Sequence, residues 1–393
     1  MRIAIFAETY VPFINGVVTH VKVLRDGLTR LGHEVLIVTA DPEAKKHYIK
    51  DGVLHCPAHT MKRLYGFGMA SPVSRKRMQL LEAFQPDVLH VQQEFGIGLF
   101  GVEAAKKLHK PLVYTLHTMY DEYLFYVVSK PLIPLAKPIA YKYFRWLAGR
   151  ATYVTSPSAK AQEFFDRCKA HRKVRLVPNS VEIEAFNPAQ FSEVELDQVR
   201  AELGIPKDTV TGIFVGRMGK EKSVDVLLGY WARFFRGDAA KRLLIVGDGP
   251  ELENLEDEAK RLGIHSQVTF TGSVEHTHIA KYYAVCDFYV TASLSEMMSI
   301  SMLEGAASGL PVVQRYDEKN ANHYQEGLNS FTYKTEEQFE EIIRRMAEAT
   351  EEEKHARKEA VRQSMKEKGE TQLAKCLLKV YRAAIHKNNQ AEA

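Results

Sequence analysis

VTGIFVGRMGKEK, residues 210–222, is the stretch that decides the fold of this chain. Its apolar half, Val210–Val215, is short and rich in β-branched residues, which predicts a buried strand. A glycine follows at once, and the cations Arg217 and Lys222 come before the next helical stretch. Glycine at this place favours a tight turn. The segment is therefore expected to form a strand, a turn and the start of a helix, the repeating unit of an α/β domain.

The same alternation of short apolar runs and helical stretches extends along nearly the whole chain. Such strands, separated by helices, are typical of parallel sheets that are covered on both faces. Helices are expected at Val17–Leu31, Glu336–Met365 and Thr371–Ala384. The other strands expected are Arg2–Phe6, Glu34–Thr39, Asp87–Gln92, Pro111–Leu116, Ala151–Thr155, Val174–Val177, Arg242–Val246, Gln267–Thr271, Phe288–Thr291 and Pro311–Val313.

The chain is expected to form two domains, because 393 residues exceed what one hydrophobic core usually supports. The alternation of strands and helices is interrupted where the sequence becomes polar, acidic and proline-containing, and it then resumes. We expect a first domain over 1–180, a linker over 181–206, a second domain over 207–370, and a last helix over 371–393 that packs back on the first domain. The predicted fold class is α/β, with two Rossmann-like, doubly wound parallel-sheet domains facing a central cleft.

Composition excludes several other classes of protein. The chain is 45% hydrophobic and 26% charged, and its formal net charge of +4 is too small to argue for nucleic acid. The four cysteines form no C-x-x-C pair, which excludes the usual zinc spacings and favours buried thiols in a reducing cytosol. No apolar window reaches the roughly 18 residues of a membrane-spanning helix, and the N-terminus lacks the apolar core of a signal peptide. A cytoplasmic protein is expected.

Two strand-to-helix turns in the second half have the chemistry of an anion site. Arg217 and Lys222 come where helix amides already attract anions, so a diphosphate would suit the turn. A solvated loop with ordinary surface cations is the alternative. Gly247-Asp248-Gly249-Pro250 forms a second tight turn after the strand ending at Val246.

A pair of glutamates follows the strand Phe288–Thr291, with seven residues between them. Glu296 is expected in a loop, and Glu304 about two turns into the next helix, where its carboxylate can accept hydrogen bonds from vicinal hydroxyls. Two surface glutamates are the usual meaning of such a spacing. The following residues Ala306–Val313, AASGLPVV, make the pattern specific.

Taken in order, Gly-Arg…Lys, Gly-Asp-Gly-Pro, Glu-x7-Glu and Ser-Gly-Leu-Pro-Val resemble glycosyltransferase family four, retaining enzymes with the GT-B fold. The opening Ala7–Val17 is similar to the family's N-terminal loop, so the resemblance covers essentially the whole chain. Together with Leu116-His117-Thr118, this opening resembles the branch that glucosylates diacylglycerol.

The resemblance implies that the domain over 1–180 binds the acceptor and the domain over 207–370 the nucleotide sugar. It also implies a role for each matching residue. Arg217 and Lys222 would hold the donor diphosphate, Glu304 the ribose, and Glu296 the sugar hydroxyls, while Gly16 and His117 would line the acceptor side. His117, Glu296, Arg217 and Lys222 are the candidate catalytic residues. The implied donor-binding set is Gly16, Arg217, Lys222, Gly247, Met298, Ser299, Ile300 and Glu304. Neither a metal nor a cofactor is implied.

One position departs from the family pattern. The family has Phe-Gly shortly after the first glutamate, where this chain has Met298-Ser299. Glycine lets backbone amides approach the donor, so serine is expected to alter donor choice or weaken donor binding.

A competing motif lies in the first half. Gly96-Ile97-Gly98-Leu99-Phe100-Gly101 fits the dinucleotide fingerprint G-x-G-x-x-G, and Asp121 follows about 20 residues later. An NAD-dependent oxidoreductase is therefore an alternative of another class, as is a sugar-nucleotide epimerase. Glu94 argues against both, because it would place a carboxylate beside the pyrophosphate.

Two stretches of the first half, 52–81 and 123–162, contain no acidic residue. In the second, cations alternate with aromatic side chains, as an interfacial membrane segment requires. A helix with a basic, solvated face is the alternative, and nucleic acid is disfavoured because no recognition module accompanies the patch. The predicted membrane-contact residues are Lys130, Lys137, Lys142, Arg145 and Trp146.

Together these observations predict a retaining hexosyltransferase. We expect glucose to pass from UDP-glucose to a lipid hydroxyl, such as that of diacylglycerol or its glycosylated form, at the inner face of the cell membrane. The expected partners are a nucleotide-sugar donor, a lipid or glycolipid acceptor and an anionic membrane surface. A soluble or polysaccharide acceptor is the alternative within the same chemistry.

Overall fold

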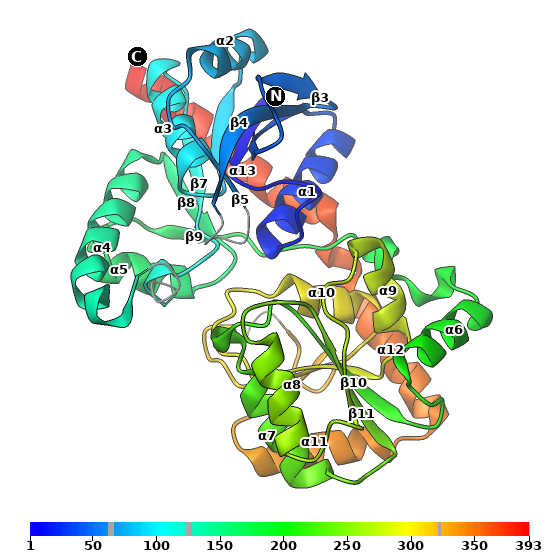
Figure 1. Ribbon diagram of the computed structural model, residues 1–393. Helices are drawn as coiled ribbons and strands as arrows, with labels where there is room; N and C mark the ends of the chain where they lie inside the picture. Colours follow the sequence, from blue (N-terminus) through cyan, green and yellow to red (C-terminus); the bar gives the residue numbers. More distant parts are fainter. Residues whose placement is uncertain (62–66, 123–127, 321–323, 393) are drawn as a thin grey trace. The chain divides into compact units, whose positions relative to one another are not determined.

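The computed structural model of the protein describes residues 1–61, 67–122, 128–320 and 324–392. The chain divides into two compact units (Figure 1). Unit 1 comprises Met1–Ser180 and Glu370–Ala393, and unit 2 comprises Val181–Gly369.

Unit 1 contains a sheet in the order β3-β4-β2-β1-β6-β7-β8-β9, with β5 paired to β4. The pairs from β4 through β2 to β9 are parallel, whereas β3 and β5 pair antiparallel with β4. The order turns back between β1 and β6, so the loops that follow these strands diverge at the place where doubly wound sheets bind ligands. The bounds are β1 Arg2–Ala7, β2 Glu34–Asp41, β3 Tyr48–Lys50, β4 Val53–Met61, β5 Phe67–Ala70, β6 Val88–Val91, β7 Leu112–Thr115, β8 Tyr153–Ser156 and β9 Val174–Leu176.

Helices cover both faces of this sheet, as the two-residue period of β1 requires. Ile3 and Ile5 face a core shared with α1 and α13, while the Phe6 ring lies 6.1 Å from the Phe100 ring of α3. The helices are α1 Gly16–Arg30, α2 Arg75–Phe84, α3 Gly96–Lys107, α4 Ile133–Arg150, α5 Lys160–Arg167 and α13 Glu370–Glu392, with short 3-10 turns at Tyr120–Glu122 and Lys130–Leu132.

The last helix, expected over 371–393, packs against α1 (Figure 1). Leu373, Leu377 and Tyr381 are buried in the core of unit 1. The two helices approach closely at Gly27, where a Cβ atom would lie 2.4 Å from the carbonyl oxygen of Glu370. The first unit is therefore built from both ends of the chain.

Unit 2 contains an all-parallel sheet in the order β12-β11-β10-β13-β14-β15. Its order turns back between β10 and β13. The strands are β10 Val210–Val215, β11 Lys241–Val246, β12 Val268–Phe270, β13 Phe288–Thr291, β14 Val312–Arg315 and β15 Ser330–Tyr333. The helices are α6 Glu193–Leu203, α7 Val224–Phe235, α8 Leu252–Arg261, α9 His276–Ala284, α10 Ile300–Ala307, α11 Glu336–Ala347 and α12 Glu351–Met365.

The structure differs from the sequence-based expectations in three places. Residues 181–206, expected to be a linker, include α6, whose Leu196, Val199 and Leu203 are buried in the core of unit 2. The single helix expected over Glu336–Met365 is two helices, because Thr350 forms a capping box that starts α12. Four strands were not expected: β3, β4, β5 and β15.

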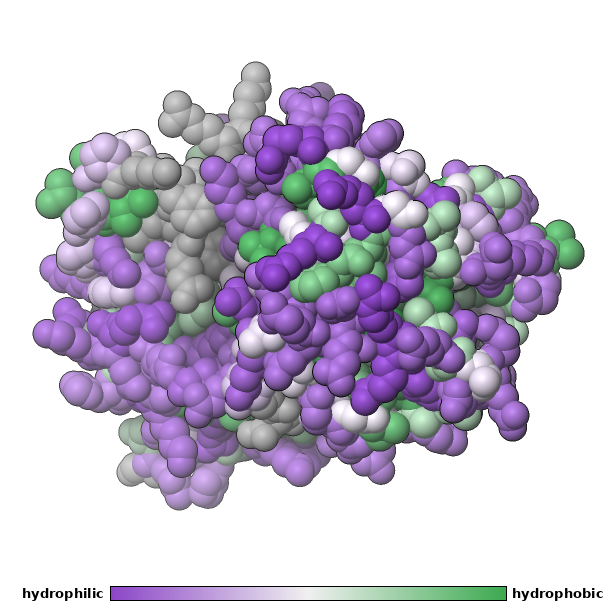
Figure 2. All heavy atoms as spheres, turned by 90° about the horizontal axis from the view of Figure 1, so that it is seen from below, coloured by the Kyte–Doolittle hydropathy of each residue, from purple (hydrophilic) through white to green (hydrophobic). Residues whose placement is uncertain are grey.

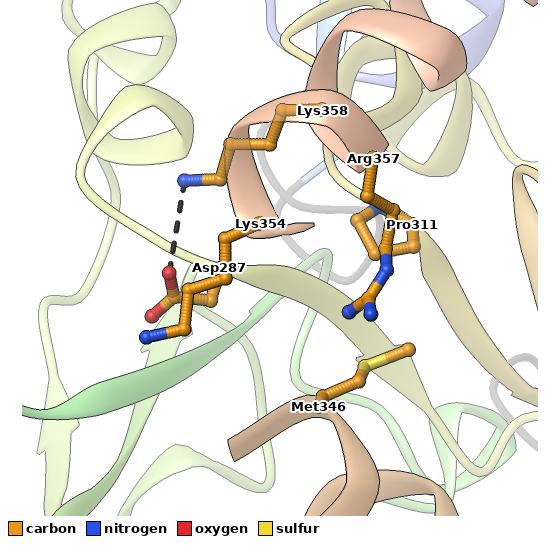
Figure 3. Close-up of a pocket in the computed structure, with 6 residues that line it drawn as sticks. All are labelled: Asp287, Pro311, Met346, Lys354, Arg357 and Lys358. Atoms are coloured by element: carbon orange, nitrogen blue, oxygen red, sulfur yellow. Dashed lines mark ion pairs between the residues drawn. The ribbon is translucent and has the colours of Figure 1, made fainter. Parts of the chain in front are cut away.

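A small pocket of unit 2 lies at the amino ends of β13 and β14, where Asp287 and Pro311 precede the strands (Figure 3). Lys358 of α12 points toward Asp287, with 3.7 Å between Nζ and Oδ1. Ligands of such sheets bind at the carboxyl ends of the strands, so this ion-paired pocket is separate from the candidate site.

Candidate active site

The cations Arg217 and Lys222 lie in the turn at the carboxyl end of β10, and each is paired with a carboxylate. Arg217 donates to Glu221 Oε1 over 2.8 Å, and Lys222 donates to Glu296 Oε1 over 2.6 Å. The Lys222 and Glu296 side chains are 19% and 20% exposed, so the pair is shielded yet still reachable. Glu296 comes from the loop between β13 and α10, as expected. The turn after β10 and the loop after β13 thus meet at the switch point of the sheet.

Neighbouring polar groups hold these two loops together. The hydroxyls of Ser293 and Ser295 donate to the carbonyl oxygen of Glu221 over 3.2 and 2.9 Å. The Asn320 amide donates to the carbonyl oxygen of Glu296 over 2.7 Å. Sequence reasoning did not select Glu221, Ser293, Ser295 or Asn320 as site residues. The serines that cluster around Glu296 in the sequence could have indicated that polar side chains hold this loop.

The turn at Gly247 requires glycine. Its φ is +130°, and a Cβ atom there would lie 1.9 Å from the carbonyl oxygen of Gly216. The adjacent Gly249, with φ +158°, would place a Cβ atom 2.5 Å from the carbonyl oxygen of Met218. The second turn therefore packs directly against the cation-bearing turn, which gives the Gly-Asp-Gly-Pro motif a packing role.

Glu304 lies in the second turn of α10, as expected, and is 5% exposed. Its carboxylate accepts a hydrogen bond from the Tyr283 hydroxyl over 3.0 Å. The side chain is therefore fixed in the unit's core with one oxygen engaged by a neighbour.

The departure at Met298-Ser299 is accommodated without strain. Ser299 has φ −66° and ψ 125°, which any residue adopts, so this backbone position does not require glycine. The Ser299 hydroxyl caps α10 by accepting from the Met302 amide over 3.4 Å, and Ile300 begins the helix. Met298 is buried in the core of unit 2. Serine at this place therefore contributes a helix cap.

In unit 1 the loops after β1 and β6 are tied together. The Thr9 amide donates to the Gln93 side chain over 2.8 Å. Asn15 caps α1 by accepting from the Val18 amide over 3.0 Å. Gly16, the first residue of α1, is exposed at this helix N-terminus.

His117 follows β7 and is half-buried beside two other histidines. Its Nε2 lies 2.6 Å from Gln92 Oε1, and its ring centroid lies 4.7 Å from that of His20. Burial lowers the pKa of His20 to about 4, and burial also lowers the pKa of His117 well below its ordinary value. Both imidazoles are therefore neutral near pH 7. Sequence reasoning placed His117 at this sheet edge but did not select Gln92. The feature that could have indicated Gln92 is that it is a polar residue at the end of an apolar strand.

The dinucleotide fingerprint of α3 is explained by packing. The Glu8 carboxylate occupies the helix N-terminus, accepting from the Ile97 amide over 2.7 Å and from the Ala70 amide over 3.0 Å. A Cβ atom at Gly96 would lie 2.0 Å from the Ala70 carbonyl oxygen. The Ile97 amide, at the helix N-terminus where a pyrophosphate would bind, is thus engaged by a carboxylate. Asp121 instead accepts from Arg167 and Tyr141 over 3.0 and 2.8 Å.

The predicted membrane segment forms the exposed helix α4 and the turn before it. Four large hydrophobic residues are exposed there: Leu132 by 52%, Leu135 by 69%, Ile139 by 71% and Trp146 by 41%. Lys142 and Arg145 are also exposed, whereas Lys137 lies 3.9 Å from Asp121. The side chain of Lys130, with Phe125 and Tyr126, lies outside the described residues.

Figure 2 shows one face of the molecule, on which hydrophobic residues gather in small groups among hydrophilic ones. Within the described parts of the chain, no helix has the length and apolarity to cross a membrane. In the same parts, no group of three or more His, Cys, Asp or Glu side chains has the arrangement of a metal site.

Comparison with known proteins identifies the family. Residues 14–185 match the family profile described as Glycosyltransferase Family 4, and residues 196–370 match Glycosyl transferases group 1. An alpha-monoglucosyldiacylglycerol synthase of Acholeplasma laidlawii is 32% identical over 87% of this chain and 87% of its own length. The Streptococcus pneumoniae protein of the same name is 30% identical over 80% of this chain and 70% of its own.

Solved structures agree in fold. Anabaena HepE in complex with UDP-glucose superposes with a TM-score of 0.74 at 17% identity, covering 98% of this chain and all of that one. Its fold is that of the two parallel-sheet α/β units described above. The chain therefore belongs to glycosyltransferase family 4, is similar to the diacylglycerol glucosyltransferase branch, and is a glycosyltransferase with the GT-B fold.

Proposed function

We propose that the protein transfers glucose from UDP-glucose, with retention of configuration, to the hydroxyl of diacylglycerol or of its monoglucosylated form. The observation that carries the proposal is the Lys222–Glu296 pair. It brings a phosphate-binding cation and a carboxylate suited to sugar hydroxyls to one edge of the unit 2 sheet. The relatives named as alpha-monoglucosyldiacylglycerol synthases support the choice of acceptor.

The donor half of the mechanism follows from these charges. Arg217 and Lys222 would bind the diphosphate and stabilise the negative charge that develops on it as the glycosidic bond breaks. The carboxylates of Glu221 and Glu296 hold both cations in position before the donor arrives. Glu296 would then accept hydrogen bonds from the sugar, and Glu304 from the ribose. Two cations and the amides of the turn would neutralise the diphosphate, so no metal is required.

Retention requires the acceptor to attack from the face that the leaving group vacates. We expect its hydroxyl proton to pass to the departing phosphate oxygen as the new bond forms. His117 and the exposed amide of Gly16 would line the acceptor side in unit 1.

A lipid acceptor requires the enzyme to dock on a membrane, and α4 has the surface for it. Leu135, Ile139, Lys142 and Trp146 recur at helical spacing, so their side chains lie along one stripe. Apolar side chains of such a stripe enter the interface, and its cations attract anionic headgroups. We infer peripheral attachment at the inner face of the cell membrane.

The decisive experiment offers labelled UDP-glucose, GDP-mannose and ADP-glucose to the protein with vesicles of phosphatidylglycerol and diacylglycerol, after exhaustive EDTA treatment. We expect UDP-glucose alone to yield a glycolipid, with an α-linkage seen by NMR. Transfer from another donor, a β-linked product, or an absolute need for added Mg²⁺ or Mn²⁺ would each refute the corresponding part of the proposal. Transfer only to soluble sugars would establish the alternative acceptor class.

A further inference from the structure

The histidine at the acceptor side has a defined hydrogen-bond partner. Gln92 is fully buried at the end of β6, and its Oε1 lies 2.6 Å from His117 Nε2. An amide oxygen only accepts hydrogen bonds, so Nε2 must carry a proton. This conclusion depends on the orientation of the Gln92 amide.

The surroundings of Gln92 fix that orientation. Its Nε2 lies 3.3 Å from both ring nitrogens of His90, so it sits over the ring face. The His90 nitrogens have other partners, Tyr381 at 2.6 Å and Thr115 at 2.7 Å. An amide N–H is attracted to the electron-rich face of an aromatic ring, whereas an amide oxygen is repelled by it. The oxygen therefore faces His117.

Because His117 is neutral and protonated at Nε2, its Nδ1 carries a lone pair. Nδ1 has no hydrogen-bond partner among the described residues, nor is it one of the buried polar atoms that lack one, so it keeps some surface accessible to solvent. His20, which is 1% exposed and held by Asn179 at 2.9 Å, packs edge-to-face against the ring and restricts its rotation.

We propose that Gln92 is a positioning residue that holds His117 in the Nε2–H tautomer, so that Nδ1 accepts a hydrogen bond from a substrate hydroxyl. In the opposite tautomer Nδ1 would carry the proton, so it could only donate to the hydroxyl oxygen and could not accept the hydroxyl proton. The inference rests on the proposed function in one respect, namely that His117 contacts a substrate. The tautomer itself belongs to the ligand-free protein.

The test combines NMR with kinetics. In ¹⁵N-histidine-labelled protein without ligands, assigned with His117→Ala, Nε2 of His117 should be protonated and Nδ1 unprotonated. Gln92→Glu places a carboxylate against Nε2, which should stabilise the imidazolium and protonate both nitrogens. Gln92→Met removes the acceptor and should yield a mixture of tautomers.

Transfer kinetics then report on the substrate. Between pH 6 and 8 the wild-type profile should be free of a His117 titration, whereas kcat/KM of Gln92→Glu should fall about tenfold or more at pH 6 and recover as pH rises. The other titratable groups facing this cluster are His20, His90 and Tyr381, which all variants retain. Gln93→Glu adds the same charge to the same loop, but its side chain faces the Thr9 amide, so its pH profile should match the wild type.

The outcomes separate the two proposals. A protonated Nδ1 in the wild type, or unchanged His117 resonances in Gln92→Glu, would overturn the assignment even if glucose transfer is confirmed. The expected tautomer together with unaltered transfer kinetics in Gln92→Glu would overturn the role of Nδ1 toward a substrate. If glucose transfer fails altogether, the NMR result still stands.

Discussion

At the scale of residues, the proposed donor site is defined by individual charges. Arg217 and Lys222 each contact a carboxylate of the same unit, so the ligand-free site is almost neutral and its cations are already oriented. A diphosphate must share these cations with Glu221 and Glu296. Under the proposed function, replacing a cation would remove a phosphate contact and would also remove the ion-pair partner of a carboxylate in the site.

Replacing Arg217 or Lys222 with alanine is expected to lower kcat/KM by about a hundredfold or more, because contacts to the leaving group strengthen as charge develops. Steady-state transfer from UDP-glucose measures the loss. Lys220 lies in the same turn, but its side chain is 69% exposed and lies 3.8 Å from Glu251. Lys220→Ala should therefore behave as wild type. Wild-type kcat/KM in Arg217→Ala would refute the diphosphate assignment.

Glu94 is expected to make the stability of the fold depend on pH. Burial raises the pKa of this carboxyl to about 7 from an ordinary 4.5, while the hydroxyls of Tyr120 and Tyr114 donate to it. A raised pKa means that the folded state binds the proton more tightly, so stability falls as pH rises from 4.5 to 7 and stays low above that. At about 1.4 kcal/mol per pKa unit, the effect amounts to a few kcal/mol.

Urea unfolding of Glu94→Gln and wild type at pH 5 and pH 8 checks this. The variant should gain stability relative to wild type as pH rises. Glu103→Gln, which alters an exposed glutamate of α3, should show no such gain. An equal difference between Glu94→Gln and wild type at both pH values would contradict the raised pKa.

At the scale of elements, α4 combines two kinds of side chain that a water-exposed helix usually separates. Its exposed stripe contains Leu135, Ile139 and Trp146 together with Lys142. The helix is held to unit 1 by Phe144, Leu147 and Ala148, which are buried, and by Tyr143, whose hydroxyl donates to the Glu94 carbonyl oxygen. The outer face of α4 can therefore contact a membrane without any change in the core of unit 1.

Lys142→Glu/Arg145→Glu is expected to lower binding to phosphatidylglycerol vesicles by about thirtyfold or more, since each cation near an anionic surface contributes about 1 kcal/mol. Vesicle sedimentation measures the change, and about 0.5 M salt should abolish most wild-type binding. Lys375→Glu/Lys379→Glu makes the same charge change on exposed positions of α13 and should bind normally. Donor hydrolysis should be unchanged in both. Equal binding of both double variants would mean that the α4 face is only solvated.

The whole molecule is organised so that each unit has its own core, although unit 1 depends on the last helix of the chain. The residues proposed to bind the donor diphosphate, Arg217 and Lys222, lie in unit 2. Binding of the donor should therefore stabilise unit 2, whereas mutations in the core of unit 1 should destabilise unit 1.

Leu377→Ala should destabilise unit 1 by about 2–5 kcal/mol, because it deletes a fully buried side chain between α13 and α1. UDP should stabilise unit 2, since it binds the folded form. Hydrogen exchange followed by mass spectrometry should show faster exchange in β1 and β6 of the variant, and slower exchange around β10 and α10 with UDP. Protection by UDP confined to unit 1 would contradict the placement of the donor site.

Local sequence determined the repeating strands and turns of both units. Val210–Val215 is confirmed as β10 with identical bounds, since a short run of apolar, β-branched residues fits a buried strand. The positions of Glu296, in a loop, and of Glu304, in a helix, were likewise predictable, because helix starts are encoded in a few adjacent residues.

Tertiary structure decided the rest, because it depends on contacts between residues far apart in the chain. The polar, acidic composition of residues 181–206 predicted a linker. Leu196, Val199 and Leu203 of this segment are buried instead, because they pack against α9 and the other elements of the unit 2 core. Ser299 is compatible with the α10 turn only because the backbone there is extended, which the family pattern could not reveal. The 2.6 Å contact between Gln92 Oε1 and His117 Nε2 joins residues 25 positions apart, which lie side by side because β6 pairs with β7.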